Sequence, residues 1–118
     1  MRILFLDDDP TRTAKFLRES IGHEVSTAET AQEAIDLLRS RSFDRVSLDH
    51  DLGGEVFVPS EHENTGYQVA KVVAEMPAPP PEVFIHSFNP AGAERMKNKI
   101  AGSIHLPFGT DAYWHMML

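Results

Sequence analysis

The sequence contains no cysteine. This absence excludes disulfide bonds, thiolate nucleophiles and cysteine-ligated zinc sites. No apolar run approaches the length of a membrane span, and residues 1–6 are too few for the apolar part of a secretory signal. Basic residues are also scarce: 11 Lys and Arg stand against 18 Asp and Glu, a net charge of −7. That charge argues against broad attraction to nucleic acid or anionic lipid, and we expect a cytoplasmic protein.

The composition is that of an ordinary soluble globular protein, with 42% hydrophobic and 25% charged residues. A chain of 118 residues is long enough to bury one sizeable core without staples. No internal repeat, low-complexity tract or linker divides it. We therefore expect a single domain over residues 1–118.

Short apolar segments typical of buried strands alternate five times with segments of helical periodicity. The expected strands span residues 2–6, 23–28, 43–48, 83–85 and 103–106. Helix starts are marked by an Asp-Pro step, a capping box and an Asn-Pro step, at Asp9, Thr30 and Asn89. The alternation predicts an α/β fold with a parallel sheet.

For two of the expected helices, the sequence predicts which apolar side chains pack against the core. In the first, Ala14, Leu17 and Ile21 form the expected apolar face, with Phe16 beside them. The last segment, residues 111–118, is barely two turns long and strongly apolar. Its apolar side chains are Tyr113, Trp114, Met116 and Met117. They either cap the edge of the core or form an interface with a protein partner or a second copy, and core capping is favoured.

Carboxylates gather where two of the expected strands end. Asp7 and Asp8 follow the first strand, and Asp49-His50-Asp51 follows the third. In an open parallel sheet ligands bind beyond the carboxyl ends of the strands, where these acids would meet. Carboxylates packed so closely take up protons unless a cation lies among them. A hard cation such as Mg²⁺ suits these oxygen ligands.

Two further features adjoin this acidic group. Ser87 ends the fourth strand, where it is placed to donate a hydrogen bond to a phosphoryl oxygen. The loop 52–64 is long and acidic, and loops of that length are often lids or binding loops. A simpler interpretation is that the acids are solvated turn residues or, like Asp9, helix caps. It accounts poorly for three acids after one strand and two after another.

Three segments resemble the motifs of response-regulator receiver domains: residues 3–10 (ILFLDDDP), 43–49 (FDRVSLD) and 83–87 (VFIHS). The order of the expected elements agrees over nearly the whole chain. The resemblance implies a receiver or flavodoxin-like fold, a doubly wound five-stranded parallel sheet with helices on both faces and a shortened last helix.

The resemblance also implies roles for individual residues. Asp7 and Asp8 match the metal-binding acid pair of receivers, and Asp49 matches their phosphoacceptor. Asp51 falls where a receiver supplies a metal ligand through its backbone carbonyl. Ser87 matches the switch serine or threonine.

The chain departs from receivers in two ways that affect its expected activity. Leu106 stands where receivers carry a lysine, so a phosphoryl group on Asp49 would lose its direct ion pair. His50 and His86 adjoin the site where receivers usually have apolar residues. Three motifs carry a closer resemblance: Asp7-Asp8 near the start, Asp49-His50-Asp51-Leu52 in the middle and His86-Ser87 before Asn89-Pro90. In these motifs the chain resembles a divergent subgroup, the cyclic-phosphate-processing receiver domains, which are associated with bacterial and phage conflict systems.

That resemblance implies hydrolysis of a cyclic phosphate or cyclic nucleotide, with Mg²⁺ or Mn²⁺ held by Asp7, Asp8 and Asp49. His50 or His86 would act as general acid or base. Three alternatives stay open. The domain is a receiver phosphorylated on Asp49, it binds a phosphorylated signal or a protein partner without chemistry, or it holds zinc through the two histidines and an aspartate.

Overall fold

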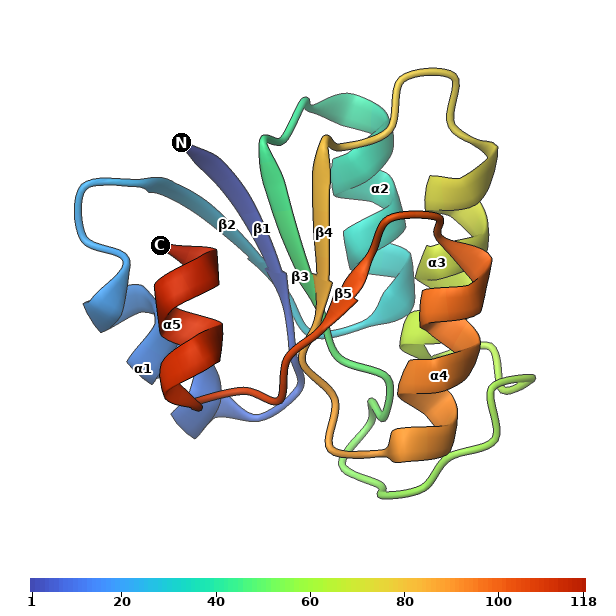
Figure 1. Ribbon diagram of the computed structural model, residues 1–118. Coiled ribbons are helices and arrows are strands. Elements are labelled where there is room, and N and C mark those ends of the chain that lie inside the picture. Colours follow the sequence, from blue (N-terminus) through green and yellow to red (C-terminus); the bar gives the residue numbers. More distant parts are fainter.

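The computed structural model describes all 118 residues and alternates strands with helices as the sequence predicts (Figure 1). The strands are β1 (Arg2–Leu6), β2 (Glu24–Ala28), β3 (Arg45–Leu48), β4 (Glu82–Ile85) and β5 (Ile104–His105). The helices are α1 (Pro10–Glu19), α2 (Ala31–Ser40), α3 (Gly66–Glu75), α4 (Pro90–Lys99) and α5 (Asp111–Met117). The side chains of Asp9, Thr30 and Asn89 accept backbone N–H hydrogen bonds at the starts of α1, α2 and α4, which confirms the three expected caps.

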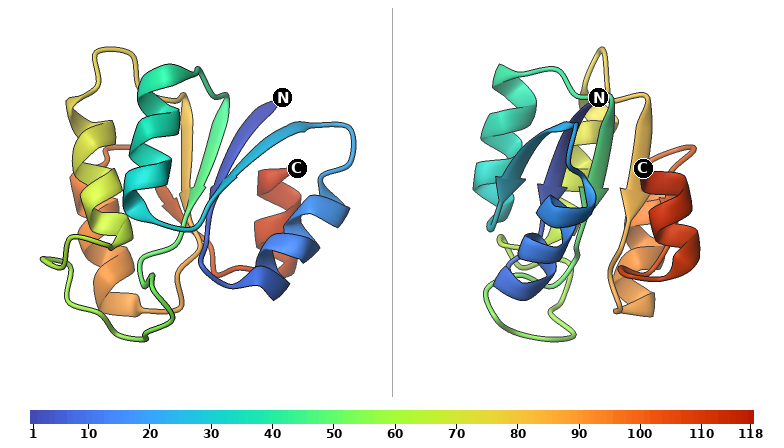
Figure 2. Two further views of the ribbon diagram at one scale, coloured as in Figure 1. Left: turned by 180° about the vertical axis from the view of Figure 1, so that it is seen from behind. Right: turned by 90° about the vertical axis from the view of Figure 1, so that its left-hand side faces the viewer.

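All five strands are parallel and lie in the order β2-β1-β3-β4-β5. Helices α2, α3 and α4 cover one face of the sheet, and α1 and α5 cover the other (Figures 1 and 2). This is the doubly wound receiver-like sheet that the sequence predicts, with a last helix of only 7 residues. Because Leu6 pairs with Leu48 across β1 and β3, the residues that follow these two strands emerge side by side.

Alternation along the strands separates two apolar layers of different character. Leu4 and Leu6 of β1 join an aliphatic cluster beneath α2, α3 and α4. Ile3 and Phe5 face the other way, into a smaller and largely aromatic cluster beneath α1 and α5. None of the five helices has the length and apolar character needed to cross a membrane.

The expected apolar face of α1 is wrong. Ala14 is exposed, and Leu17 and Ile21 are 45% and 85% exposed, whereas Phe16 is fully buried. Phe16 stacks on Phe5 of β1 with ring centroids 4.3 Å apart. The helix therefore presents the face that carries Phe16 to the sheet, and Arg12, one turn earlier, shares that face.

Three of the four apolar side chains of α5 cap the core, as the favoured interpretation predicts, whereas Met116 is exposed. Tyr113 and Met117 are fully buried in the aromatic cluster, and Trp114 packs against it. Arg45 of β3 donates hydrogen bonds to the carbonyl oxygens of residues 116 and 117, at 3.1 and 2.9 Å. These contacts hold the end of the chain against the sheet.

Candidate functional site

A pocket of about 440 Å³ opens at the carboxyl ends of β1, β3 and β4. Its polar lining includes Asp8, Arg12, Asp49, Asp51, Ser87 and Asn89. We call it the acidic pocket. A second hollow, of about 660 Å³, lies at the opposite end of the sheet and has no carboxylate in its lining. The acidic pocket is thus the one that combines the expected ligand-binding edge with the expected acids.

Asp7 lies behind the pocket, 1% exposed, and its carboxylate is fully engaged. Arg12 donates to both oxygens, from Nε at 2.8 Å and from Nη2 at 2.9 Å. The backbone N–H of Asp9 adds a bond to Oδ1 at 2.8 Å, and His86 Nε2 lies 2.9 Å from Oδ2. Burial opposes ionisation, but the hydrogen bonds from His86 and Arg12 prevail and lower the pKa of Asp7 to about 2. With two hydrogen bonds on each oxygen, Asp7 has no acceptor position left for a metal ion.

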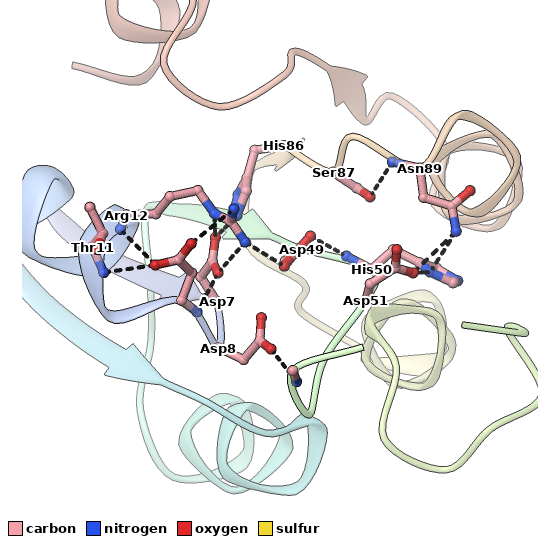
Figure 3. A network of polar contacts seen from close by, with 12 residues as sticks. Asp7, Asp8, Thr11, Arg12, Asp49, His50, Asp51, His86, Ser87 and Asn89 are labelled. Carbon is pink, nitrogen blue, oxygen red and sulfur yellow. Dashed lines mark hydrogen bonds and ion pairs between the residues drawn. The ribbon is translucent and has the colours of Figure 1, made fainter. Parts of the chain in front are cut away.

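Arg12 is a charged residue of the candidate site that the sequence motifs did not indicate. It is the one basic side chain that lines the acidic pocket. Its Nη2 also lies 3.6 Å from Asp49 Oδ2, so the guanidinium bridges Asp7 and Asp49 (Figure 3). The hydrogen bond to Asp7 raises the pKa of Arg12, and its charge is permanent. The signal in the sequence was its position one turn before Phe16, on the face of α1 that meets the sheet.

The lysine position of receivers supplies no charge here. Leu106 packs against the aromatic cluster and does not line the pocket. The fixed positive charge of this site therefore comes from α1, on the other side of Asp49, and not from the end of β5.

Asp49 is the carboxylate that the surroundings destabilise most. It is 5% exposed, and burial together with the negative charge of Asp7 raises its pKa to about 8. Arg12 counteracts this rise without cancelling it. Asp49 Oδ1 accepts the His50 N–H at 2.9 Å, whereas Oδ2 has no hydrogen-bond donor and has only the ion pair with Arg12 Nη2, at 3.6 Å. The acidic pocket thus contains more carboxylate charge than its single guanidinium neutralises.

Asp8 is the second acid that keeps an open oxygen. It is half-buried and accepts one hydrogen bond, at 2.6 Å from the Gly54 N–H to Oδ2. Mg²⁺ typically binds through one or two carboxylates and retains several waters. Asp8 and Asp49 fit such an ion because both line the pocket and both keep a free oxygen.

The expected pairing of Asp7 with Asp8 as metal ligands does not match this arrangement. Ligand atoms of Asp7, Asp49 and His86 do lie within 4.8 Å of one another. However, Asp7 Oδ2 and His86 Nε2 are hydrogen-bonded to each other. Arg12 and the Asp9 N–H occupy the remaining acceptor positions of the Asp7 carboxylate. Proximity alone does not make a metal site, because a ligand atom needs a free lone pair.

His86 is buried on the α1 and α5 side of the sheet and does not line the pocket. Its ring stacks on Phe5, with centroids 4.9 Å apart, and its Nδ1 lies 2.7 Å from Ser47 Oγ. Ser47 Oγ lies 2.7 Å from the Tyr113 hydroxyl. Burial lowers the pKa of His86, and a neutral ring that donates from Nε2 to Asp7 and accepts at Nδ1 satisfies every group in this line. His86 therefore holds Asp7 in place.

His50 is buried on the opposite face and also lies outside the pocket. Its Nδ1 lies 2.7 Å from Asp51 Oδ1 and its Nε2 lies 2.8 Å from Ser60 Oγ. Neither histidine is thus placed as the expected acid or base facing a reacting group. Because the two rings lie on opposite faces of the sheet, they also cannot share one zinc ion.

The Asp51 carboxylate organises the loops around the pocket. It accepts hydrogen bonds from the N–H groups of Phe57 and Val58, at 2.7 and 3.2 Å, and from Asn89 Nδ2 at 3.1 Å. Burial by itself would raise the pKa of Asp51, but the hydrogen bonds from His50 and Asn89 outweigh burial and lower this pKa. Its predicted metal-binding group, the backbone carbonyl, is separate from this network.

Ser87 lies where the sequence predicts, buried and in the pocket lining. Its Oγ accepts the Asn89 N–H at 3.0 Å. That bond leaves the hydroxyl hydrogen free to donate toward the pocket.

Similar solved structures define the class of fold. A response regulator from Burkholderia pseudomallei, solved with a phosphorylated aspartic acid, calcium ion and citrate, is 19% identical with a TM-score of 0.68, over 98% of this chain and 64% of that one. The receiver domain of a putative Luxo repressor protein from Vibrio parahaemolyticus is 17% identical with a TM-score of 0.72, over 98% and 84%. The HemR receiver domain from Leptospira biflexa is 22% identical with a TM-score of 0.67, over 98% and 88%. This likeness establishes a receiver fold.

A finer assignment comes from the sequence family. The family described as the cyclic-phosphate processing receiver domain matches residues 2–102. The chain belongs to this family. The match includes every residue of the acidic pocket and ends before β5 and α5. No curated protein matches the chain.

Proposed function

We propose that this domain hydrolyses a cyclic phosphate ester, with cyclic nucleotides as the substrate class, and that a divalent cation is held at the acidic pocket. The observation that carries the proposal is the charge imbalance in that pocket. Asp8 and Asp49 each keep a carboxylate oxygen that has no hydrogen-bond donor. The Arg12 guanidinium beside them already donates its hydrogen bonds to Asp7. The family description supports the choice of a cyclic phosphate.

The residues of the chain would divide the work as follows. Asp8 and Asp49 hold Mg²⁺ or Mn²⁺, with the Asp51 backbone carbonyl in the position that the receiver resemblance implies. When bound, the cation offsets negative charge that develops on the phosphoryl oxygens. Arg12 presents a fixed guanidinium to the same phosphoryl group, and Ser87 donates its hydroxyl hydrogen to it.

In this proposal the two histidines do not contact the substrate but hold other side chains in position. His86 holds Asp7, and Asp7 holds the Arg12 guanidinium at the pocket wall. His50 holds Asp51, which anchors the loop after β3. Both are positioning residues, because neither lines the pocket.

A second candidate is a receiver phosphorylated on Asp49. The observation that favours it is the open Asp49 oxygen in the pocket, at the position that receiver motifs assign to the phosphoacceptor. The regulator from Burkholderia pseudomallei carries a phosphorylated aspartic acid. Leu106 counts against it, because the lysine that pairs with the phosphoryl group in receivers is missing. A third candidate function is binding of a phosphorylated ligand without turnover, which the experiment must distinguish from the other two.

The decisive experiment is turnover of a pooled set of cyclic mono-, di- and trinucleotides with Mg²⁺ or Mn²⁺, read by chromatography and mass spectrometry. We expect a linear product from the wild type and a loss of at least about a hundredfold in rate for Asp49→Asn. Asp36→Asn is the matched control, because Asp36 is an exposed carboxylate on α2, outside the pocket. A protein that binds Mg²⁺ but forms no product would contradict hydrolysis. A gain of one phosphoryl mass with acetyl phosphate would then support phosphorylation of Asp49.

A further inference from the structure

Two phenylalanines stand out because they are exposed and line the same pocket. The chain has seven Phe, two Tyr and one Trp. Among these ten aromatic residues only Phe57 and Phe88 are exposed, at 71% and 59%, and both line the acidic pocket. Apolar rings left in water forgo the free energy of burial. Two such rings on one pocket therefore suggest that a ligand covers them.

Phe57 is held in position by backbone contacts. Its φ of 53° makes it the one non-glycine residue with a positive φ, a conformation that L-residues rarely adopt. The N–H groups of Phe57 and Val58 both donate to the Asp51 carboxylate, at 2.7 and 3.2 Å. The strained backbone and its hydrogen bonds display this ring at the pocket.

Phe88 is anchored to the same carboxylate from the other side. Its neighbour Asn89 donates a side-chain hydrogen bond to Asp51 at 3.1 Å and a backbone hydrogen bond to Ser87 Oγ at 3.0 Å. Asp51 thus ties together the segment after β3 that carries Phe57 and the segment after β4 that carries Phe88. The backbone segments that carry the two rings are thus held beside the carboxylates of Asp8 and Asp49, which line the same pocket.

The pocket therefore has a charged part and an aromatic part. A ligand that fits both carries a phosphate and a planar ring, and the base of a nucleotide stacks well on aromatic side chains. A volume of about 440 Å³ lies in the range of small-molecule sites. We infer that Phe57 and Phe88 form a stacking subsite for the base of a nucleotide whose phosphate lies at Asp8, Asp49 and Arg12. The inference rests on the proposed function and deepens it, because it names the side chains that hold the base of the nucleotide.

The test compares ligands with and without a base. Calorimetric binding is measured in Mg²⁺ for adenosine 5′-monophosphate, uridine 5′-monophosphate and ribose 5-phosphate. The variants are Phe57→Leu and Phe88→Leu, which keep apolar bulk but remove the π face. We expect at least one nucleotide to bind wild type about tenfold tighter than ribose 5-phosphate, and each variant to lose about tenfold for that nucleotide only. Ile21→Ala is the matched control, because Ile21 is an exposed, non-aromatic apolar residue outside the pocket lining.

Binding requires no turnover, so the subsite and the enzyme can fail separately. Base-dependent binding with no hydrolysis keeps the subsite and overturns the enzyme. Hydrolysis with equal affinity for ligands with and without a base overturns the subsite. It is also overturned if the two Leu variants leave nucleotide affinity unchanged and instead abolish self-association in sedimentation, because the rings would then be a protein contact.

Discussion

Arg12 decides the character of the site at the scale of single residues. Receivers are expected to place an acid pair toward the metal, yet here one member of the pair, Asp7, is saturated by Arg12, His86 and a backbone N–H. The consequence is a site with one internal cation and two acids that still need one. A guanidinium suits this task better than a lysine would, because its fork donates to both oxygens of one carboxylate.

The raised pKa of Asp49 predicts that the stability of the folded protein depends on pH. Its pKa rises from 3.8 to about 8 on folding, so ionising it costs the folded protein free energy. Its contribution is most favourable at low pH and is lost as the pH rises from about 4 through about 8. Without divalent cations, we therefore expect Asp49→Asn to unfold at a higher temperature than wild type at pH 9. The gain should be on the order of 1 kcal/mol or more and should shrink toward pH 5.

The measurement is thermal unfolding in EDTA between pH 5 and pH 9, with Asp36→Asn as the exposed control. Melting curves of wild type and Asp49→Asn that keep a constant separation across this range would contradict a raised pKa for Asp49.

Two helices approach the acidic segment closely because each has a glycine in its first turn near that segment. A Cβ on Gly66 of α3 would collide with the backbone carbonyl of Asp49. A Cβ on Gly92 of α4 would lie 2.5 Å from Cγ of the buried His50 ring. The glycines thus allow α3 and α4 to pack on residues 49–51, whose positions define the pocket.

Gly92→Ala sets two effects of opposite sign against each other. Helix propensity favours alanine over glycine by about 1 kcal/mol. Overpacking against a buried ring costs about 1–3 kcal/mol, and the rigid backbone of α4 leaves little room to relax. We expect a net loss of up to about 2 kcal/mol in urea unfolding. Asn98→Ala, at an exposed site on the same helix, should be neutral or stabilising, and a Gly92→Ala variant that is more stable than wild type would show that α4 is not confined by His50.

Binding of a cation to the folded protein can be measured as an increase in its stability, provided that the effect of the net charge is controlled. With a net charge of −7, any salt screens repulsion, so Mg²⁺ must be compared with NaCl at equal ionic strength. A cation that binds only the folded state adds about 2.7 kcal/mol at a hundredfold excess over its Kd. For a chain of this size that is roughly 11 °C in melting temperature.

We expect Asp8→Asn to lose most of this Mg²⁺-dependent shift, because it removes one of the two open carboxylates. Asp36→Asn should keep it. An Asp8→Asn protein that Mg²⁺ stabilises as strongly as wild type would contradict the assignment of Asp8 as a ligand.

The sequence by itself determined the fold and the region of the site. Strand and helix segments follow from local periodicity, and the caps at Asp9, Thr30 and Asn89 follow from local hydrogen bonding, so both can be read from neighbouring residues. The meeting of Asp7 with Asp49 follows from the order of the strands, because β1 and β3 lie side by side in a doubly wound sheet.

Only the tertiary structure decided how the side chains are used. Helix α1 offered two candidate faces, and stacking of Phe16 on Phe5 selected the one that also brings Arg12 to Asp7. With α1 in this orientation, Arg12 donates hydrogen bonds to both oxygens of Asp7. The packing of the core also placed His50 and His86 outside the pocket. Such outcomes depend on which lone pairs and ring faces distant segments occupy, and spacing along the chain carries no information about that occupancy.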